Sequence, residues 1–302
     1  MSVYTQLTDD QFAAFCQSFG VSFARAIPIT QGIKNSNWFI ETTDDVAGAP
    51  SYVFTLFEER PPADIEKMAV ILNQLDGKLP VAAPLSVIES NIAQTNNAQT
   101  DSDKRYVIHC ENKAITLVPC LAGSHPEQTT QAMCHEIGAA LAMLHETLQA
   151  LQPSEQYGVP LYPWSDVRDR ESQFMPSDEA KLMSDIWRAY TDLPLASLPK
   201  GLCHLDMFAD NTLWHLQKGE ARLTGLLDFT EVSVEHYVMD IAITINDFCT
   251  TWGDAEQGES VNFDRSKMTA FLQGYESKRP LSDDENRALP VMLAKAAVIF
   301  WL

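Results

Sequence analysis

The hydrophobic pattern of this sequence changes near residue 120, and this change restricts the fold more than any other feature. Before it, short apolar runs such as residues 38–42 and 52–57 are bounded by polar or Gly-containing turns, a pattern typical of β-strands. After it, residues 131–148 repeat apolar side chains every three or four positions, as an amphipathic helix does. Strands followed by helices predict an α+β protein in two lobes.

The individual elements divide in the same way. In the first part, strands are expected over residues 21–30, 38–42, 52–57, 86–88, 105–109 and 114–118. A helix is expected after the capping-box pattern Thr8-x-x-Gln11, and another over residues 63–75. In the second part, helices are expected over residues 131–148, 164–174, 178–190, 236–250, 264–275 and 283–301, with short strands over 212–215 and 223–227.

These elements predict an N-terminal lobe of residues 1–118, a hinge of residues 119–123 and a C-terminal lobe of residues 124–302. The polar segment 91–100 is interpreted as an exposed loop. Residues 293–302 are still in helical register at the last residue and include no C-cap residue. We therefore expect the chain to stop short of its natural terminus.

Acidic residues greatly outnumber basic ones. Asp and Glu total 41 against 21 Lys and Arg, which gives a formal net charge of -20. A surface this acidic repels nucleic acid and anionic lipids, so we expect neither as a partner. A polyanionic ligand such as ATP would need metal ions, backbone amides and a few local cations.

The distribution of cysteine and apolar residues predicts a cytoplasmic protein. The six cysteines include no C-x-x-C pair, which favours reduced, buried thiols over disulfides or zinc. The first residues lack the basic and apolar regions of a signal peptide. No apolar run approaches the roughly 20 residues that span a bilayer.

The strongest chemical signal is the pattern His204-x-Asp206-x-x-x-x-Asn211, followed after a predicted strand by Asp228-Phe229. Phosphoryl transfer needs an acceptor hydroxyl that is oriented and relieved of its proton, and Asp206 suits this task. Asn211 and Asp228 offer the oxygen ligands that Mg²⁺ prefers. His204 would brace the loop through hydrogen bonds.

This combination resembles the catalytic and metal-binding loops of the aminoglycoside phosphotransferase and choline kinase superfamily, relatives of the protein kinases. The resemblance implies a protein-kinase-like two-lobe fold. Its N-lobe would hold an antiparallel β-sheet with a helix, and its C-lobe would be mostly helical. ATP and Mg²⁺ are the cofactors it implies, with Asp240 as a structural brace of the catalytic loop.

A narrower resemblance covers nearly the whole chain and is to the homoserine kinases of this superfamily. It is carried by the segments at residues 30–39, 53–58, 79–84, 240–249, 274–281 and 289–301. The resemblance implies ATP-dependent phosphorylation of the side-chain hydroxyl of L-homoserine to O-phospho-L-homoserine, a step toward threonine.

Residues of the first lobe are candidates for holding the nucleotide. Small or polar residues in the predicted turn 31–37 let backbone amides approach phosphates; these are Gly32, Asn35, Ser36 and Asn37. Thr55 occupies the strand position where kinase-like folds place Lys or Arg, and the homoserine kinases are similar in having Thr there. Lys34 is an alternative source of positive charge. Val118 and Cys120 lie where such folds bind the adenine.

The acceptor site is less specified by the sequence. Asp247, Asn246 and Glu231 are candidates for binding an ammonium group, and Arg168 or Arg170 for binding a carboxylate. Trp164 and Trp252 could shape the pocket or fill the core.

Choline, ethanolamine and aminoglycosides are alternative acceptors because all are cations. A non-catalytic nucleotide-binding protein on a kinase-like fold is a further alternative. The oligomeric state is left open.

Overall fold

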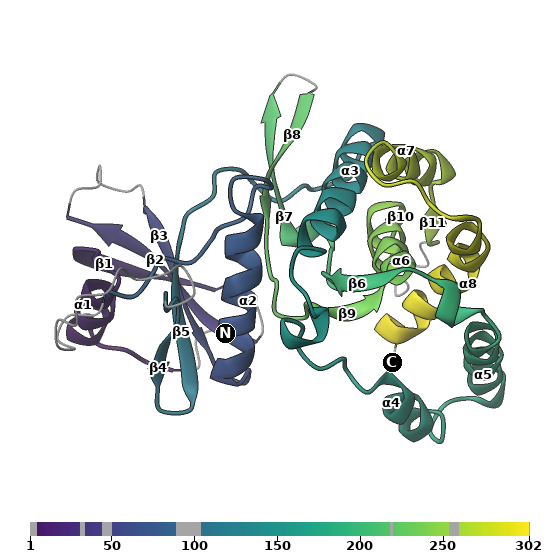
Figure 1. Cartoon of the computed structure of the whole chain (residues 1–302), viewed down its shortest axis with the longest axis horizontal. Helices are drawn as coiled ribbons and strands as arrows, with labels where there is room; N and C mark the ends of the chain where they lie inside the picture. Colours follow the sequence, from purple (N-terminus) through teal and green to yellow (C-terminus); the bar gives the residue numbers. More distant parts are fainter. Residues whose placement is uncertain are drawn as a thin grey trace. The chain divides into compact units, whose positions relative to one another are not determined.

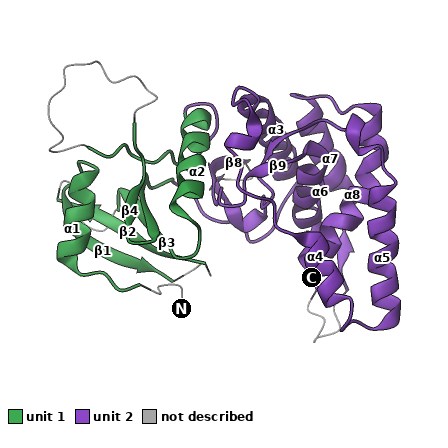
Figure 2. Ribbon diagram, turned by 60° about the horizontal axis from the view of Figure 1, so that its bottom comes forward, with its two compact units in different colours: residues 1–76, 81–121 green, residues 77–80, 122–302 purple. Residues whose placement is uncertain are grey.

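The computed structural model describes residues 5–30, 34–43, 50–88, 104–217, 220–253 and 260–301. The chain forms two compact units (Figure 2): unit 1 contains residues 1–76 and 81–121, and unit 2 contains residues 77–80 and 122–302. The division between residues 121 and 122 falls within the segment 119–123. Gly32 and the segment 91–100 lie outside the described residues.

Unit 1 is built on a five-stranded antiparallel sheet in the order β1-β2-β3-β5-β4 (Figure 1). Its strands are β1 (Phe23–Ile29), β2 (Asn35–Thr42), β3 (Tyr52–Phe57), β4 (Ile108–Cys110) and β5 (Lys113–Pro119). Helices α1 (Asp9–Ser18) and α2 (Pro62–Leu75) lie on opposite sides of this sheet in both ribbon views. This architecture confirms the predicted antiparallel N-terminal sheet.

Aromatic side chains fill the core between α1 and the sheet. The Phe12 ring lies 5.1 Å from the Trp38 ring and 5.2 Å from the Phe54 ring, both edge to face. The predicted capping box is present at the start of α1, where the Thr8 side chain accepts a hydrogen bond from the Gln11 N–H. The cap fixes where α1 begins, and Phe12 then faces the sheet.

The strand predicted over residues 86–88 is wrong, and the strand predicted over 105–109 begins only at Ile108. Residues 85–88 make single backbone hydrogen bonds instead of a strand ladder. Leu85 N donates to Leu117 O at 2.9 Å, and Val87 N donates to Arg105 O at 2.7 Å. Pro84 precedes these residues and has no N–H to donate, which disfavours a continuous strand there.

Unit 2 is mostly helical. Its helices are α3 (Gln131–Leu148), α4 (Trp164–Glu171), α5 (Ser177–Thr191), α6 (Tyr237–Phe248), α7 (Arg265–Glu276) and α8 (Asp283–Trp301), with short 3₁₀ turns η2 (Ser154–Gln156), η3 (Leu195–Ser197) and η4 (Ala209–Asn211). Ten of the twelve residues of α6 are buried, so α6 is the central helix of the unit. A mostly helical second part is what the sequence predicted.

In the described part of unit 2, three two-stranded antiparallel sheets accompany these helices. They pair β6 (Lys200–Cys203) with β9 (Ser233–His236), β7 (Thr212–Gln217) with β8 (Glu220–Leu226), and β10 (Thr250–Thr251) with β11 (Asn262–Phe263). Pro80 belongs to this unit because its carbonyl accepts a hydrogen bond from Leu226 N at 2.8 Å. The β6–β9 and β7–β8 pairs flank the segments that carry the predicted chemistry.

Helices α3 and α7 pack side by side through two glycines (Figure 1). A Cβ atom on Gly138 would lie 2.2 Å from the Phe271 carbonyl oxygen, and one on Gly274 would lie 1.9 Å from the His135 carbonyl oxygen. Neither position has room for a side chain, so the close approach of these helices depends on both glycines.

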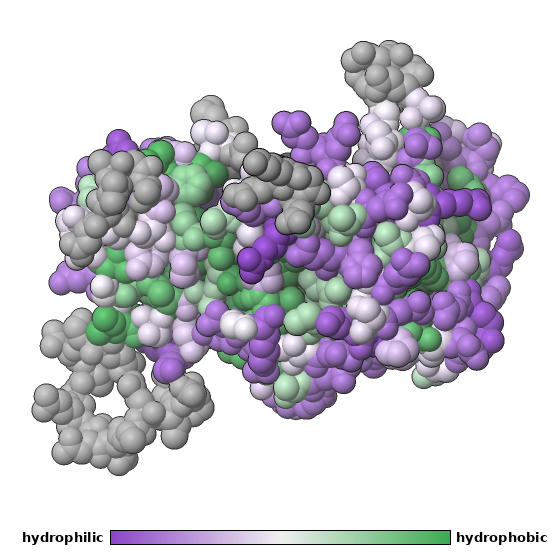
Figure 3. Space-filling view, turned by 90° about the horizontal axis from the view of Figure 1, so that it is seen from above, coloured by the Kyte–Doolittle hydropathy of each residue, from purple (hydrophilic) through white to green (hydrophobic). Residues whose placement is uncertain are grey.

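The visible surface of unit 2 is mostly polar. On the right of Figure 3, hydrophilic side chains form most of the visible surface of this unit. Among the described residues, no helix combines the length and apolarity needed to cross a membrane.

Candidate active site

The segment between β6 and β7 carries Asp206 on a tight turn. The Phe208 N–H donates to the Asp206 carbonyl at 2.9 Å, and the Asn211 N–H donates to the Phe208 carbonyl at 3.0 Å. Leu205 has a φ of 63°, a left-handed conformation that reverses the chain just before Asp206. The chain then enters η4 and continues into β7.

Two aspartates of α6 hold the backbone of this turn. Asp240 accepts hydrogen bonds from the His204 and Leu205 N–H groups, both at 2.8 Å. Asp247 accepts one from the Ala209 N–H at 2.7 Å. The two aspartates are seven positions apart, so they project from the same side of the helix, two turns apart. The turn around Asp206 is therefore fixed at both ends through backbone amides.

Asp240 is itself part of a fully buried polar network. His145 lies with Nε2 2.9 Å from Asp240 Oδ2 and Nδ1 2.7 Å from the Tyr275 hydroxyl. Burial opposes ionisation of Asp240, but the hydrogen bonds that it accepts from His145 and from the Leu205 N–H outweigh burial and hold its pKa below the ordinary value. The brace is therefore a carboxylate at neutral pH.

His204 contacts backbone atoms on both sides of its ring. Nδ1 accepts a hydrogen bond from the Asp206 N–H at 3.2 Å, and Nε2 lies 3.0 Å from the Leu227 carbonyl oxygen. This pairing assigns the ring proton to Nε2. Burial lowers the pKa of His204, so the ring is neutral at pH 7. The ring also meets Phe229 edge to face, at 4.6 Å between centroids.

Asn211 and Asp228 lie on neighbouring segments. The Asn211 Nδ2 donates to the Asp206 carbonyl at 2.8 Å and to Asp206 Oδ2 at 3.0 Å, which turns its amide oxygen away from Asp206. The Leu227 N–H donates to the Asn211 carbonyl at 2.9 Å and so ties the two segments together.

Asp228 has a φ of 52°, and its Oδ1 accepts a hydrogen bond from the Thr230 hydroxyl at 2.5 Å. The structure thus brings together His204, Asp206, Asn211 and the segment of Asp228, as the spacing had suggested.

A pocket of about 770 Å³ opens beside this turn. Its lining comes from the turn, from α6, from α8 and from the segments around them: Pro126, Phe208, Ala209, Asp210, Ile243, Asn246, Asp247, Trp252, Ala296, Ala297, Phe300 and Trp301. Asn246 is anchored to α8 by a 2.9 Å hydrogen bond from Nδ2 to the Leu293 carbonyl. Burial raises the pKa of Asp247.

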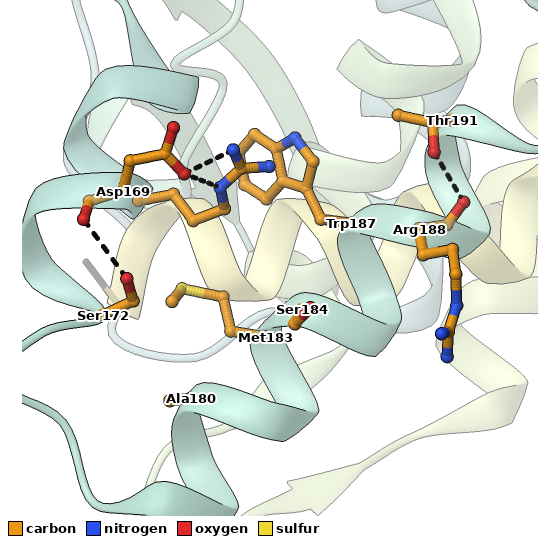
Figure 4. Close-up of a pocket in the computed structure, with 9 residues that line it drawn as sticks. Asp169, Ser172, Ala180, Met183, Ser184, Trp187, Arg188 and Thr191 are labelled. Carbon is orange, nitrogen blue, oxygen red and sulfur yellow. Dashed lines mark hydrogen bonds and ion pairs between the residues drawn. The ribbon is translucent and has the colours of Figure 1, made fainter.

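The remaining acceptor candidates of the sequence lie elsewhere. Glu231 is in the turn before β9 and is not among the residues that line this pocket. Arg168 lines a different pocket of about 360 Å³ between α4 and α5 (Figure 4), where its guanidinium lies 4.7 Å from the Trp187 ring centre and is paired with Asp169. Arg170 is paired with the neighbouring Glu171. Trp164 packs against the cluster of Met183, Trp187 and Val298.

In unit 1, the predicted nucleotide-site residues fall on paired strands. Thr55 on β3 faces Asn37 on β2, and its hydroxyl donates to Asn37 Oδ1 at 2.8 Å. Asn35 pairs with Phe57 on the same two strands. At the other end of the sheet, Val118 pairs with Val53, and the Cys120 N–H donates to the Ser51 carbonyl at 2.9 Å.

A network near Ser36 was not predicted from the sequence. Ser36 is fully buried and donates to the Glu58 carboxylate, which also pairs with the Lys113 ammonium. Thr5 joins the network through a 2.9 Å hydrogen bond from its hydroxyl to Glu58. Lys113 follows Glu58 by 55 positions, so no local pattern could reveal the pair. His145 gave a signal that was missed, since a histidine in the buried stripe of a helix needs polar partners.

A second group of potential metal ligands exists among the described residues. His145, Cys203 and Asp240 are buried with their donor atoms within 4.8 Å of one another. Both Asp240 oxygens already accept backbone hydrogen bonds. The hydrogen bonds of Asp240 to His145 and to the backbone of the turn therefore explain why these residues lie close together, without a bound ion.

The sequence of residues 25–281 matches the model of the phosphotransferase enzyme family. The homoserine kinase of Neisseria meningitidis serogroup B is 30% identical over 306 residues, covering 100% of this chain and 90% of that protein. The homoserine kinase of Acidiphilium cryptum is 29% identical over 308 residues, covering 100% of this chain and 87% of its own length.

Solved structures resemble the chain in fold. Amicoumacin kinase in complex with AMP-PNP, Ca²⁺ and Ami has a TM-score of 0.68 at 15% identity, covering 97% of this chain and 85% of that one. Choline kinase from Cryptosporidium parvum has a TM-score of 0.56 at 11% identity, covering 97% and 88%. These likenesses confirm the protein-kinase-like fold. With the sequence matches, they show that the chain belongs to the phosphotransferase enzyme family and, within it, to the homoserine kinases.

Proposed function

We propose that this protein transfers the γ-phosphoryl group of ATP to the side-chain hydroxyl of L-homoserine, giving ADP and O-phospho-L-homoserine. The observation that carries the proposal is the turn 204–211, where Asp206 and Asn211 are held in hydrogen-bond contact by backbone bonds to α6. The full-length similarity to homoserine kinases supports the choice of acceptor. The absence of membrane-spanning helices in the described part of the chain is compatible with a reaction in the cytoplasm.

Asp206 is the proposed general base. Its carboxylate would accept a hydrogen bond from the homoserine hydroxyl and take its proton as the bond to phosphorus forms. Asn211 holds one carboxylate oxygen, and His204 holds the backbone N–H of Asp206. His204 is therefore a positioning residue, neutral and buried, and it does not exchange protons with the substrate.

The donor set of Asn211 and Asp228 fits a divalent cation. Asn211 directs its amide nitrogen to Asp206, so its amide oxygen is the atom that would bind the ion. Asp228 uses Oδ1 for Thr230, which leaves its second carboxylate oxygen as the ligand. Mg²⁺ accepts such oxygen ligands, and when bound it neutralises charge on the phosphates. The amicoumacin kinase complex with AMP-PNP and Ca²⁺ supports the use of a nucleotide and a divalent cation.

The proposed nucleotide contacts come from unit 1. Gly32, Asn35, Ser36 and Asn37 would approach the phosphates, and Thr55 would act through its hydroxyl. Val118 and Cys120 would contact the adenine. Lys34 or Lys113 would supply positive charge. Lys113 has structural support for a fixed position because it pairs with Glu58.

The test is ADP release with Mg·ATP and each of L-homoserine, choline, ethanolamine and kanamycin. We expect turnover with homoserine, and a loss of about 10²- to 10⁴-fold in kcat for Asp206→Asn with nucleotide binding retained. Turnover with a different acceptor alone would refute the assignment of homoserine. Nucleotide binding without turnover of any acceptor would indicate a non-catalytic protein.

A further inference from the structure

The Asp247 carboxylate contacts the catalytic turn and also lines the adjacent pocket. On one side, its Oδ2 accepts the Ala209 N–H at 2.7 Å and so holds the turn that carries Asp206. On the other side, it lines the pocket of about 770 Å³ next to that turn. A side chain in this position can contact a bound acceptor and the catalytic turn at once.

The pocket has the chemistry of a site for an organic cation. Two carboxylates, Asp210 and Asp247, stand in its lining. The aromatic rings in the lining are those of Phe208, Trp252, Phe300 and Trp301. Of the described residues that line it, none is basic. Carboxylates in a partly desolvated pocket attract an ammonium group strongly, and aromatic faces add to that attraction.

The pocket is also shaped by contacts that do not depend on a ligand. Phe208 meets Phe300 of α8 edge to face, at 4.8 Å between ring centroids. Asn246, one residue before Asp247, is bonded to α8. The walls on either side of Asp247 are therefore joined to each other, which favours a pre-formed site.

We propose that Asp247 binds the ammonium group of the acceptor and thereby selects amino alcohols over alcohols without a positive charge. The inference rests on the proposed phosphotransfer to homoserine and adds the residue that recognises the acceptor. Because the same carboxylate holds the Ala209 N–H, the ammonium is bound at a fixed place relative to the turn of Asp206. The homoserine carboxylate, which meets no basic residue of the described lining, points out of the pocket.

The proposal predicts unequal effects of the two charged groups of the acceptor. γ-Hydroxybutyrate lacks the ammonium of homoserine, and propanolamine lacks its carboxylate. Wild-type kcat/KM should fall further for γ-hydroxybutyrate than for propanolamine. The opposite order would contradict a site that recognises the ammonium.

Asp247→Asn is the decisive variant because the amide oxygen of Asn can still accept the Ala209 N–H. Loss of a charge-assisted contact should raise the KM for homoserine and propanolamine about ten- to a hundred-fold. kcat should change less, and neither the KM for ATP nor kcat/KM for γ-hydroxybutyrate should change. Glu276→Gln, which removes an exposed charge at the end of α7, is the matched control and should leave every parameter unaltered.

Trp252→Leu provides a second variant should Asp247→Asn fold poorly. Trp252 is 61% exposed and its side chain hydrogen-bonds Asp247, so its replacement should preserve the fold and weaken acceptors that carry an ammonium more than γ-hydroxybutyrate. An equal fall of kcat for charged and uncharged acceptors in Asp247→Asn would show that Asp247 only positions the turn, and would overturn the proposal.

Calorimetric titration with propanolamine separates this inference from the proposed function. Binding by the wild type that is weakened in Asp247→Asn supports the ammonium site even if no ADP is released with homoserine, an outcome that would refute the proposed reaction alone. Equal binding by both proteins would refute the site while leaving the reaction intact.

Discussion

Unit 1 centres on the rings of Phe12, Trp38 and Phe54, whereas the centre of unit 2 contains the hydrogen-bonded side chains of His145, Asp240 and His204. An apolar core depends on volume and shape, and its residues carry no charge toward a site. The polar centre of unit 2 stabilises the unit through the same bonds that hold the turn of Asp206. Stability and activity should therefore be separable in the aromatic core of unit 1 and coupled in the polar centre of unit 2.

Replacing Asp240 should give the largest effect. Asp240→Ala removes the acceptor of the His204 and Leu205 N–H groups and the partner of His145, all of them buried. Breaking a buried charged network on one side costs about 3–5 kcal/mol of unfolding free energy. We expect kcat to fall together with stability, as measured by ADP release and urea unfolding of the same preparation.

Asp240→Asn is the matched control, since it keeps one oxygen acceptor in place. It should lose less of both quantities than Asp240→Ala. A wild-type kcat in a destabilised Asp240→Ala protein would contradict the coupling of stability and activity in the polar centre of unit 2.

Phe12→Ala tests the apolar side of the comparison. The ring is 3% exposed and packs on Phe23, Trp38 and Phe54. Removing it should lower the unfolding free energy by about 3–5 kcal/mol, because the cavity left behind adds to the lost burial. At a temperature where the variant is folded, kcat should equal that of the wild type. A severalfold loss of kcat under those conditions would show that the core of unit 1 is also coupled to the chemistry.

Acidification should produce a smaller, graded effect that originates in unit 2. Burial lowers the pKa of His204. Below about pH 6.5 this histidine is therefore protonated in the unfolded chain but not in the folded protein. The pKa of Asp240 is also lowered, and its contribution is lost at more acidic pH as the carboxylate is protonated. Asp247, whose pKa is raised by burial, acts in the opposite direction.

The unfolding free energy should therefore decrease as the pH falls, by at most about 1.4 kcal/mol per pH unit for each group. Urea unfolding between about pH 8 and pH 5 measures this slope. Phe12→Ala should show the wild-type slope, and His204→Gln a flatter one. A slope that His204→Gln leaves unaltered would place its origin outside the polar centre.

Much of the fold could be predicted because amphipathic helices show their period in the sequence. The helix predicted over residues 131–148 has the bounds of α3, and those of α5, α7 and α8 differ from the prediction by a residue or two at most. Strands β6 and β9 were not predicted. Three of the four residues of β6 are buried, so the strand shows no alternation of polar and apolar side chains.

The turn of Asp206 could be predicted because its residues lie close together in the sequence and match the groups that phosphoryl transfer requires. The hydrogen-bonded network of His145, Asp240 and Tyr275 could not be predicted. His145 and Tyr275 are 130 positions apart, and their hydrogen bond follows from the packing of α3 on α7. Asp247 could be named as a candidate, but its bond to the Ala209 N–H required the three-dimensional structure.

The seven-residue spacing of Asp240 and Asp247 along α6 has a consequence for how the acceptor range of such a protein could change. A straight helix sets the two carboxylates about 10.5 Å apart along its axis, and each is bonded to the turn through main-chain amides. Substitutions of the side chains at Phe208 and Ala209 can therefore remodel the pocket wall, while the hydrogen bonds from α6 keep the backbone path of the turn unchanged. The side-chain atoms of these residues can thus change which acceptor is bound, while their main-chain atoms preserve the geometry of phosphoryl transfer.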